Sequence, residues 1–347
     1  MGAVSDWVNM GSLGRMRMWL LAIAVALLAS SAMHLGGLID LSKSIYPGPN
    51  FTWLSYLVGG FLFGVGMTLG SGCGNKTLVR IGAGNLKSVV VLLFLAVSAY
   101  MTLKGLFGIW RVTALDPVAV DLGARGLAGQ DIASIAAGAF GIGKQAALAV
   151  AALVVAGGLL AFAFADRDFR TSAEMVVGGA VIGLVVVGGW YLTGHVGFQE
   201  NPETLEVMAF GTNSRNPESM SFVAPSAYVL ELLMLWSDKS LGVTFGVAIV
   251  LGVVAGSLAY ALTSRTFRWE GFSSAEDTAN HIVGGILMGA GGVTAMGCTI
   301  GQGITGVSTL AVGSFIAVAG IVAGSVATMK YQYWRLERME SLAGATA

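Results

Sequence analysis

Long runs of apolar residues, separated by shorter polar segments, dominate this chain. Eight runs are long enough to cross the hydrocarbon core of a bilayer as helices. They lie at about 18–34, 53–72, 86–104, 144–165, 175–193, 241–263, 278–297 and 308–330. The pattern also predicts a loop with a short helix over 113–143, and the longest polar loop over 195–226. We therefore expect an all-α polytopic membrane protein in which residues 1–347 form a single integral membrane domain.

Composition indicates the same class of protein. Hydrophobic residues make up 55% of the 347 positions and charged residues only 11%, whereas a soluble domain has about 25% charged residues. The lipid bilayer is therefore the expected solvent for most of the surface. The formal net charge is zero, which argues against nucleic acid as a partner. Glycine is unusually frequent, with 51 residues, and small residues let membrane helices approach closely.

Positive charge orients the predicted spans, because cytoplasmic loops carry an excess of Lys and Arg. With eight crossings, four basic clusters fall on one side: Arg15 and Arg17, Arg167 and Arg170, Arg265 and Arg268, and Lys330, Arg335 and Arg338. We expect that side to be the cytoplasm and the membrane to be the cell inner membrane. The 195–226 loop then faces the periplasm.

An internal repeat relates two glycine-rich segments, each of which carries one of the only two cysteines. Residues 59–73 (GGFLFGVGMTLGSGC) align without gaps with residues 284–298 (GGILMGAGGVTAMGC), and seven of the fifteen positions are identical. In the predicted topology these segments run in opposite directions, as in an inverted repeat with a pseudo-two-fold axis in the membrane plane. We expect repeat halves at about 18–165 and 175–335, whose broken or re-entrant helices meet near the membrane centre.

The residues around both cysteines are suited to binding an anion. The nine candidates are Gly72, Cys73, Gly74, Thr77 and Arg80 in the first segment, and Gly297, Cys298, Thr299 and Gln302 in the second. Backbone N–H groups at helix N-termini, hydroxyls and amides can hold oxyanion oxygens, and Arg80 can raise the local potential for anions. A thiol is soft and polarisable, so a ligand with a terminal sulfur and hard oxygens, such as thiosulfate, fits this mixture. We predict a substrate-binding or relay site.

Three other interpretations of the cysteines are open. A buried cysteine is often an inert small hydrophobic residue. A metal site is disfavoured because no His or carboxylate lies near either cysteine in the sequence, and we expect no metal and no cofactor. A catalytic thiolate needs an activating base or a positive field. No His is close in the sequence, although Arg80 could supply the field.

The two segments GGFLFGVGMTLGSGCGNKTLVRIGAGNLKS and GGILMGAGGVTAMGCTIGQGITG resemble the paired signatures of the YeeE/YedE sulfur-transport membrane proteins. The register of Gly, Cys, Arg80, Gly82 and Gly84 matches that family, and the resemblance covers most of the chain. It implies an inner-membrane transporter or channel, not an enzyme, that imports thiosulfate by relay between central cysteine thiols. Cys73 and Cys298 match those cysteines by motif. The resemblance also implies a link to a cytoplasmic sulfur-carrier or rhodanese-like protein.

Functions of other classes stay open at this level. A membrane sulfurtransferase would carry a persulfide on one cysteine, and a non-catalytic scaffold would only anchor sulfur carriers. Within transport, selenium or other sulfur species are alternative substrates, because some family members are associated with selenium. Family members usually begin with a further segment that carries a third cysteine, so we expect Met1 to be an internal methionine of a longer natural chain.

Overall fold

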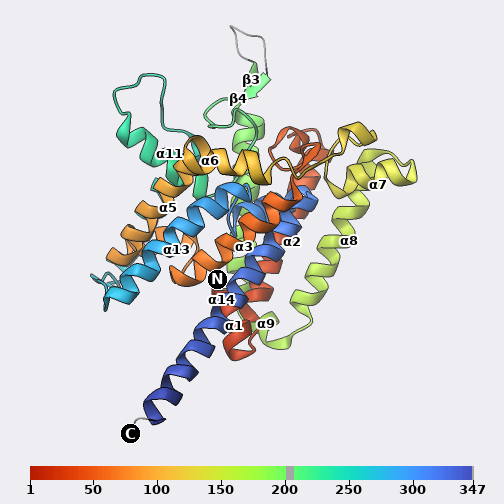
Figure 1. Cartoon of the computed structure of the whole chain (residues 1–347). Coiled ribbons are helices and arrows are strands. Elements are labelled where there is room, and N and C mark those ends of the chain that lie inside the picture. Colours follow the sequence, from red (N-terminus) through yellow and green to blue (C-terminus); the bar gives the residue numbers. More distant parts are fainter. Residues whose placement is uncertain (201–206, 346–347) are drawn as a thin grey trace.

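Helices form most of the structure, a computed structural model that describes residues 1–200 and 207–345 (Figure 1). The α-helices are α1 (Gly2–Met10), α2 (Gly14–Leu35), α3 (Trp53–Leu69), α4 (Gly74–Gly82), α5 (Leu86–Lys104), α6 (Leu106–Trp110), α7 (Ile132–Phe140), α8 (Lys144–Phe164), α9 (Arg167–Thr171), α10 (Ala173–Tyr191), α11 (Val223–Met234), α12 (Phe245–Thr263), α13 (Ala275–Thr294) and α14 (Val312–Ala345). Short helical segments are η1 (Leu41–Lys43), η2 (Arg111–Leu115), η3 (Gly123–Arg125), η4 (Leu192–Val196), η5 (Gly301–Gly306) and η6 (Val307–Thr309). Two antiparallel strand pairs join β1 (Asn50–Phe51) to β2 (Val120–Asp121) and β3 (Phe198–Glu200) to β4 (Val207–Ala209).

Seven helices are long and apolar enough to cross a membrane, counted over the described ranges. They are Gly14–Leu35, Trp53–Gly82, Leu86–Lys104, Lys144–Phe164, Ala173–Val196, Phe245–Thr263 and Val312–Met339. The all-α multi-pass membrane fold is therefore confirmed, as is a short helix, α7, within 113–143. The predicted run 278–297 forms α13, whose first turn carries Glu276 and Asp277. These charges lower its mean hydropathy, so seven spans stand where the pattern predicted eight.

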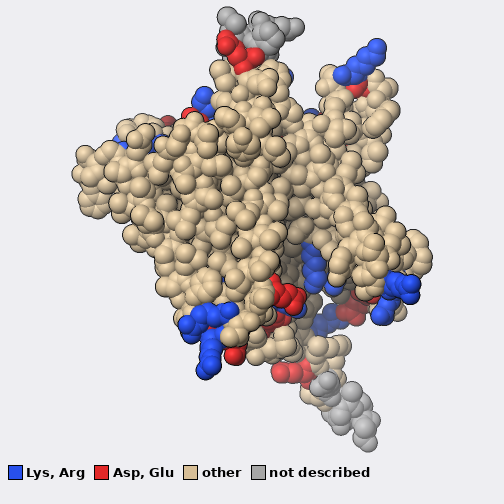
Figure 2. All heavy atoms as spheres, turned by 180° about the vertical axis from the view of Figure 1, so that it is seen from behind, with Lys and Arg blue, Asp and Glu red and all other residues tan. Residues whose placement is uncertain are grey.

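The connecting segments gather at two opposite ends of the helices. The loop face holds 36–52, 105–143, 192–200 and 207–222, and the β1–β2 pair joins the first two of these segments. The terminal face holds α1, α9, 264–274 and the far end of α14 (Figure 1). Figure 2 shows charged residues mainly toward these two ends, with a broad uncharged band between them. That distribution is what a membrane-spanning surface requires. Residues 201–206 of the predicted 195–226 loop lie outside the described residues.

Two of the long helical paths are broken, and each break contains one of the cysteines. The first separates α3 from α4 at residues 70–73, and the second separates α13 from η5 at residues 295–300. Ser71 and Met296 both adopt the left-handed conformation with φ 57°, which is unfavourable for residues other than glycine. The two residues are 225 positions apart, so the aligned segments share an unusual backbone turn as well as a sequence pattern.

Helices α3 and α13 cross with their backbones in direct contact at glycines. A Cβ atom added to Gly59 would lie 2.5 Å from the Ala295 nitrogen, and one added to Gly284 would lie 2.5 Å from the Gly70 nitrogen. Each position is related to its counterpart by the same 225-residue offset. Likewise, Gly64 abuts the Ile321 carbonyl of α14. Its counterpart Gly289 abuts a carbonyl of α5. Each of these two helices, α3 and α13, thus packs, at an equivalent glycine, against a helix of the other half.

Further contacts follow this reciprocal pattern. Helix α1 packs against α2 and α14, whereas α11 packs against α12 and α5. The intervening helices α8 and α10 pack along α2. The inverted repeat and its halves stay a prediction, which these matched contacts support. The matched contacts involve α1–α5 in the first half and α11–α14 in the second half.

We expect Gly64→Ala and Gly289→Ala to destabilise the protein strongly. The added methyl group would overlap a backbone carbonyl in a neighbouring helix, and overpacking of this kind costs about 1–3 kcal/mol or more. Gly157→Ala in α8 is the matched control, because nothing lies within 4 Å of its Cβ position. Thermal unfolding of the detergent-purified proteins measures the effect. Equal melting temperatures for Gly64→Ala and Gly157→Ala would contradict the close crossing.

Candidate functional site

Cys73 lies at the start of a helix inside the first break. It occupies the N-cap position of α4, and only 9% of its surface is exposed. The Lys76 backbone N–H and the Thr299 hydroxyl both approach its thiol. Because Thr299 belongs to the second break, the two glycine-rich segments meet at this thiol.

Cys298 is fully buried in the second break. The Gly301 N–H donates to its sulfur at 3.4 Å, and the Phe222 N–H, at the start of α11, also approaches it. Cys73 and Cys298 belong to one apolar cluster that includes Met67 and Met288. Backbone donors from α4, α11 and η5 are therefore gathered around a pair of thiols in an apolar setting.

The polar residues predicted beside the cysteines stabilise the two breaks. The Thr77 hydroxyl donates to the Cys73 carbonyl at 3.1 Å. The Gln302 side-chain amide donates to the Ala295 carbonyl, while its buried Oε1 has no hydrogen-bond partner among the described residues. Thr77 and Gln302 occupy equivalent positions at the 225-residue offset. The Thr77 hydroxyl bonds back within the first turn of α4, whereas the Gln302 amide spans the second break and its Oε1 stays a free acceptor.

The three predicted glycines differ in how much they are required. A Cβ atom at Gly72 would lie 3.1 Å from the Lys76 side chain, and one at Gly297 would lie 3.1 Å from the Gln302 side chain and backbone. The nearest atoms to a Cβ at Gly74 are 3.7 Å away, which is ordinary contact. Gly72 and Gly297 therefore permit the tight turns, whereas Gly74 has room for a methyl group.

The Arg80 side chain contacts the first break and also lines a pocket at the terminal face. Its Nη1 donates to the Ser71 carbonyl at 3.1 Å, which holds the left-handed turn just before Cys73. Arg80 also lines an open pocket of about 410 Å³, together with Arg268 and Glu270. Its charge is therefore available at the terminal face, and the described hydrogen bonds do not join it to either thiol.

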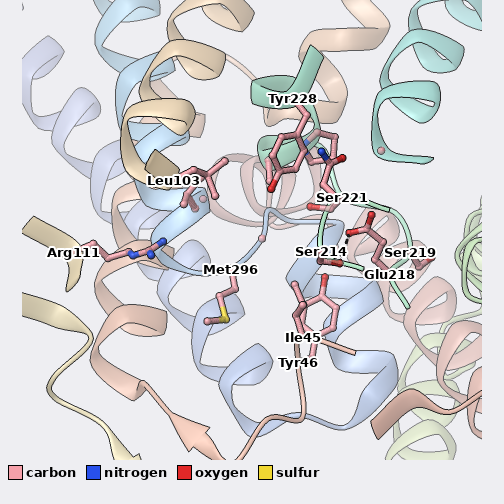
Figure 3. A pocket seen from close by; sticks show the side chains of 17 residues that line it. Ile45, Tyr46, Leu103, Arg111, Ser214, Glu218, Ser219, Ser221, Tyr228 and Met296 are labelled. Atoms are coloured by element: carbon pink, nitrogen blue, oxygen red, sulfur yellow. Dashed lines mark hydrogen bonds between the residues drawn. The ribbon is translucent and has the colours of Figure 1, made fainter. Parts of the chain in front are cut away.

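A second cavity, of about 260 Å³, opens on the loop face and reaches Gly297, the neighbour of Cys298. Figure 3 shows Arg111 on one side of this outer cavity and Glu218, Ser214 and Tyr46 close together on the other, and Tyr228 also lines the cavity. Arg111 is not among the nine candidate residues predicted from the sequence. These wall residues come from segments far apart in the chain, so no local motif marks them.

The Arg111 side chain is held in place by its neighbours. Its Nε lies 3.2 Å from an Asp116 carboxylate oxygen, and Asp116 accepts the Ser55 hydroxyl at 2.7 Å. Arg111 therefore occupies a fixed position in the wall of the outer cavity, where the Asp116 carboxylate is its ion-pair partner. Across residues 1–200 and 207–345, no group of three or more His, Cys, Asp or Glu side chains is placed to hold a metal ion.

Seven candidate spans, two broken helices and a buried thiol pair define a polytopic helical membrane protein with a cysteine-centred core. The family model described as Sulphur transport matches residues 1–327, and the chain belongs to that family. The family expected from the two cysteine segments is confirmed.

Two relatives share most of the chain. The thiosulfate transporter TsuA of Escherichia coli (strain K12) is 26% identical over 336 residues, which cover 94% of this chain and 87% of the relative. The thiosulfate transporter TsuA of Spirochaeta thermophila is 27% identical over 274 residues, which cover 78% of this chain and 74% of the relative. The names of the family and of these relatives are those of transporters.

We expect both native thiols to resist alkylation in the folded protein. Cys73 is nearly buried and Cys298 is fully buried, and a thiol reacts only where a reagent can reach it. With N-ethylmaleimide in mild detergent, they should react at least about tenfold more slowly than a thiol added at Met10→Cys, a position that is 70% exposed. Denaturation should release both thiols. Rapid labelling of Cys298 in the folded protein would contradict its burial.

Proposed function

We propose that this protein imports a small sulfur-containing anion, with thiosulfate as the leading substrate, across the cell inner membrane. The observation that carries the proposal is that Cys73 and Cys298 share one apolar cluster. This cluster lies between the outer cavity, which reaches Gly297, and the Arg80 pocket on the opposite face. The transporter names of the relatives support the same function.

The chemistry of the thiol pair suits an anion with one soft and several hard atoms. A neutral thiol is polarisable and makes weak contacts to sulfur. The nearby N–H groups of Lys76, Phe222 and Gly301 can donate to oxygens, and Thr299 adds a hydroxyl. Leaving a buried polar group without such partners costs several kcal/mol. Weak contacts at successive positions let the ion pass without being trapped, and no covalent bond is required.

The positions of the two cavities set the order in which the anion meets the relay residues. With the loop face toward the periplasm, the anion meets Arg111 first and then Cys298, because Gly297 lines the outer cavity. It passes next to Cys73, whose N–H and hydroxyl neighbours come from both breaks. It leaves through the Arg80 pocket on the cytoplasmic side. A cytoplasmic sulfur-carrier or rhodanese-like protein is the proposed recipient.

Removal of either thiol should abolish most transport. We expect Cys73→Ala and Cys298→Ala each to lower the initial rate of radiolabelled thiosulfate uptake at least about tenfold, which corresponds to ~1.4 kcal/mol of lost stabilisation at one relay position. The assay uses cells that lack other thiosulfate importers. Ser30→Ala is the control, because Ser30 is a small residue buried in α2. Normal uptake by both cysteine variants would refute the relay.

Arg111 should contribute to anion capture. We expect Arg111→Gln to raise KM for thiosulfate about five- to tenfold with a smaller change in kcat, because loss of a nearby cation costs about 1 kcal/mol. Arg125→Gln is the control, since Arg125 is an exposed arginine on the same face. Kinetics at low and high ionic strength test the electrostatic origin. Equal KM values for the two variants would contradict this role.

A further inference from the structure

The segment before α11 descends from the loop face into the protein and is held there by hydrogen bonds. The Thr193 hydroxyl donates to the Glu218 carbonyl at 2.6 Å and accepts the Glu218 N–H at 3.1 Å. The Ser219 hydroxyl donates to the Val186 carbonyl at 2.6 Å, and the Thr305 hydroxyl donates to the Met220 carbonyl at 2.8 Å. Residues 218–220 are therefore tied to α10, η4 and η5.

This fixation positions the Glu218 side chain in the wall of the outer cavity (Figure 3). Its carboxylate accepts the Ser214 hydroxyl at 3.4 Å and is approached by the Asn213 N–H. Glu218 is absent from the salt bridges between described residues, and Arg111, which is paired with Asp116, lies on the other side of the cavity.

The other ionisable groups around Glu218 are two tyrosines and an ion pair. Tyr46 and Tyr228 line the same cavity, and burial raises the pKa of the Tyr228 phenol, so this group is uncharged near neutral pH. Behind Tyr228, Lys104 and Glu231 form an ion pair at 2.6 Å. Glu218 is thus the carboxyl group that faces the cavity.

Burial raises the pKa of Glu218 to about 7, although the hydrogen bonds from Ser214 and Asn213 favour the ionised form. Below that pH the carboxyl group is neutral and can donate a hydrogen bond. Above it the group is an anion in a confined, partly apolar space. Two like charges about 4 Å apart repel by about 4 kcal/mol at an effective dielectric constant near 20.

We propose that Glu218 is the protonatable residue that controls admission to the outer cavity. A sulfur oxyanion occupies the cavity when Glu218 carries a proton, and the carboxyl O–H then donates to an anion oxygen. When Glu218 is ionised, the anion is repelled. This inference rests on the proposed function and adds that uptake depends on external pH.

The test is thiosulfate uptake at substrate concentrations below KM, with external pH varied from 5.5 to 8.5 and internal pH held constant. Thiosulfate keeps the same charge over this range. The protonated fraction of a group with a pKa of about 7 falls about tenfold between pH 6 and pH 8, and wild-type uptake should fall with it. Glu218→Gln, which is neutral and can donate a hydrogen bond at any pH, should give a flat profile near the acidic wild-type rate.

Two further variants sharpen the experiment. Ser214→Ala removes a hydrogen bond that favours the ionised form, so the midpoint of the wild-type profile should move to higher pH. Glu200→Gln removes an exposed carboxylate from the same loop and should leave the profile unchanged.

The outcomes separate this inference from the proposed function. A flat wild-type profile, or a Glu218→Gln profile that still falls with pH, overturns the role of Glu218 while transport itself stands. Loss of uptake at every pH in the wild type would instead remove the proposed function. If Glu218→Gln fails to fold, as judged by gel filtration, the Ser214→Ala profile decides: an upward shift supports the inference, and no shift or a downward shift overturns it.

Discussion

The structure depends on the glycine-to-backbone contact between α3 and α13. Gly59 and Gly284 have no room for a side chain, and each faces the backbone that leads into the other helix's break. Without a hydrophobic effect between helices in lipid, close packing of this kind supplies much of the association energy. The contact brings two chain breaks together, and with them the two cysteines. The thiol pair is therefore a result of helix packing.

Each break also leaves backbone carbonyl groups outside regular helical hydrogen bonding, and side chains donate hydrogen bonds to them. In the first, Arg80 and Thr77 bind the carbonyls of Ser71 and Cys73. In the second, the Gln302 side chain binds the Ala295 carbonyl. Non-helical backbone inside a membrane protein is tolerated only when such partners exist or when it lines a cavity. Residues that the pattern predicted as anion ligands thus have a structural task as well, so their substitution affects both the fold and the proposed relay.

Much of the centre could be predicted from the sequence, because the repeat preserves register. Glycine and cysteine at one fixed offset indicated the two breaks, and the apolar runs indicated the membrane helices. The outer cavity could not be predicted in this way. Arg111, Tyr46 and Glu218 come from three connecting segments, and their meeting depends on long-range packing that leaves no periodic signal. Helix α11 was also missed, because its twelve residues are too few for a span and follow a polar, proline-containing stretch.

Cys73 and Cys298 lie in one apolar cluster, and the Lys76 cation that acts on Cys73 is fixed to the protein. A dianion that crosses this cluster carries its full charge through the membrane field, and a cell interior that is negative by 100 mV opposes this movement by about 2.3 kcal/mol per charge. For two charges the opposing work is ~4.6 kcal/mol, which corresponds to a concentration ratio of roughly two thousand. Thiol contacts cannot provide this work, since they are made and broken in each passage. Net import of a dianion along the proposed route therefore requires rapid consumption of sulfur inside the cell or a cation that moves with the anion.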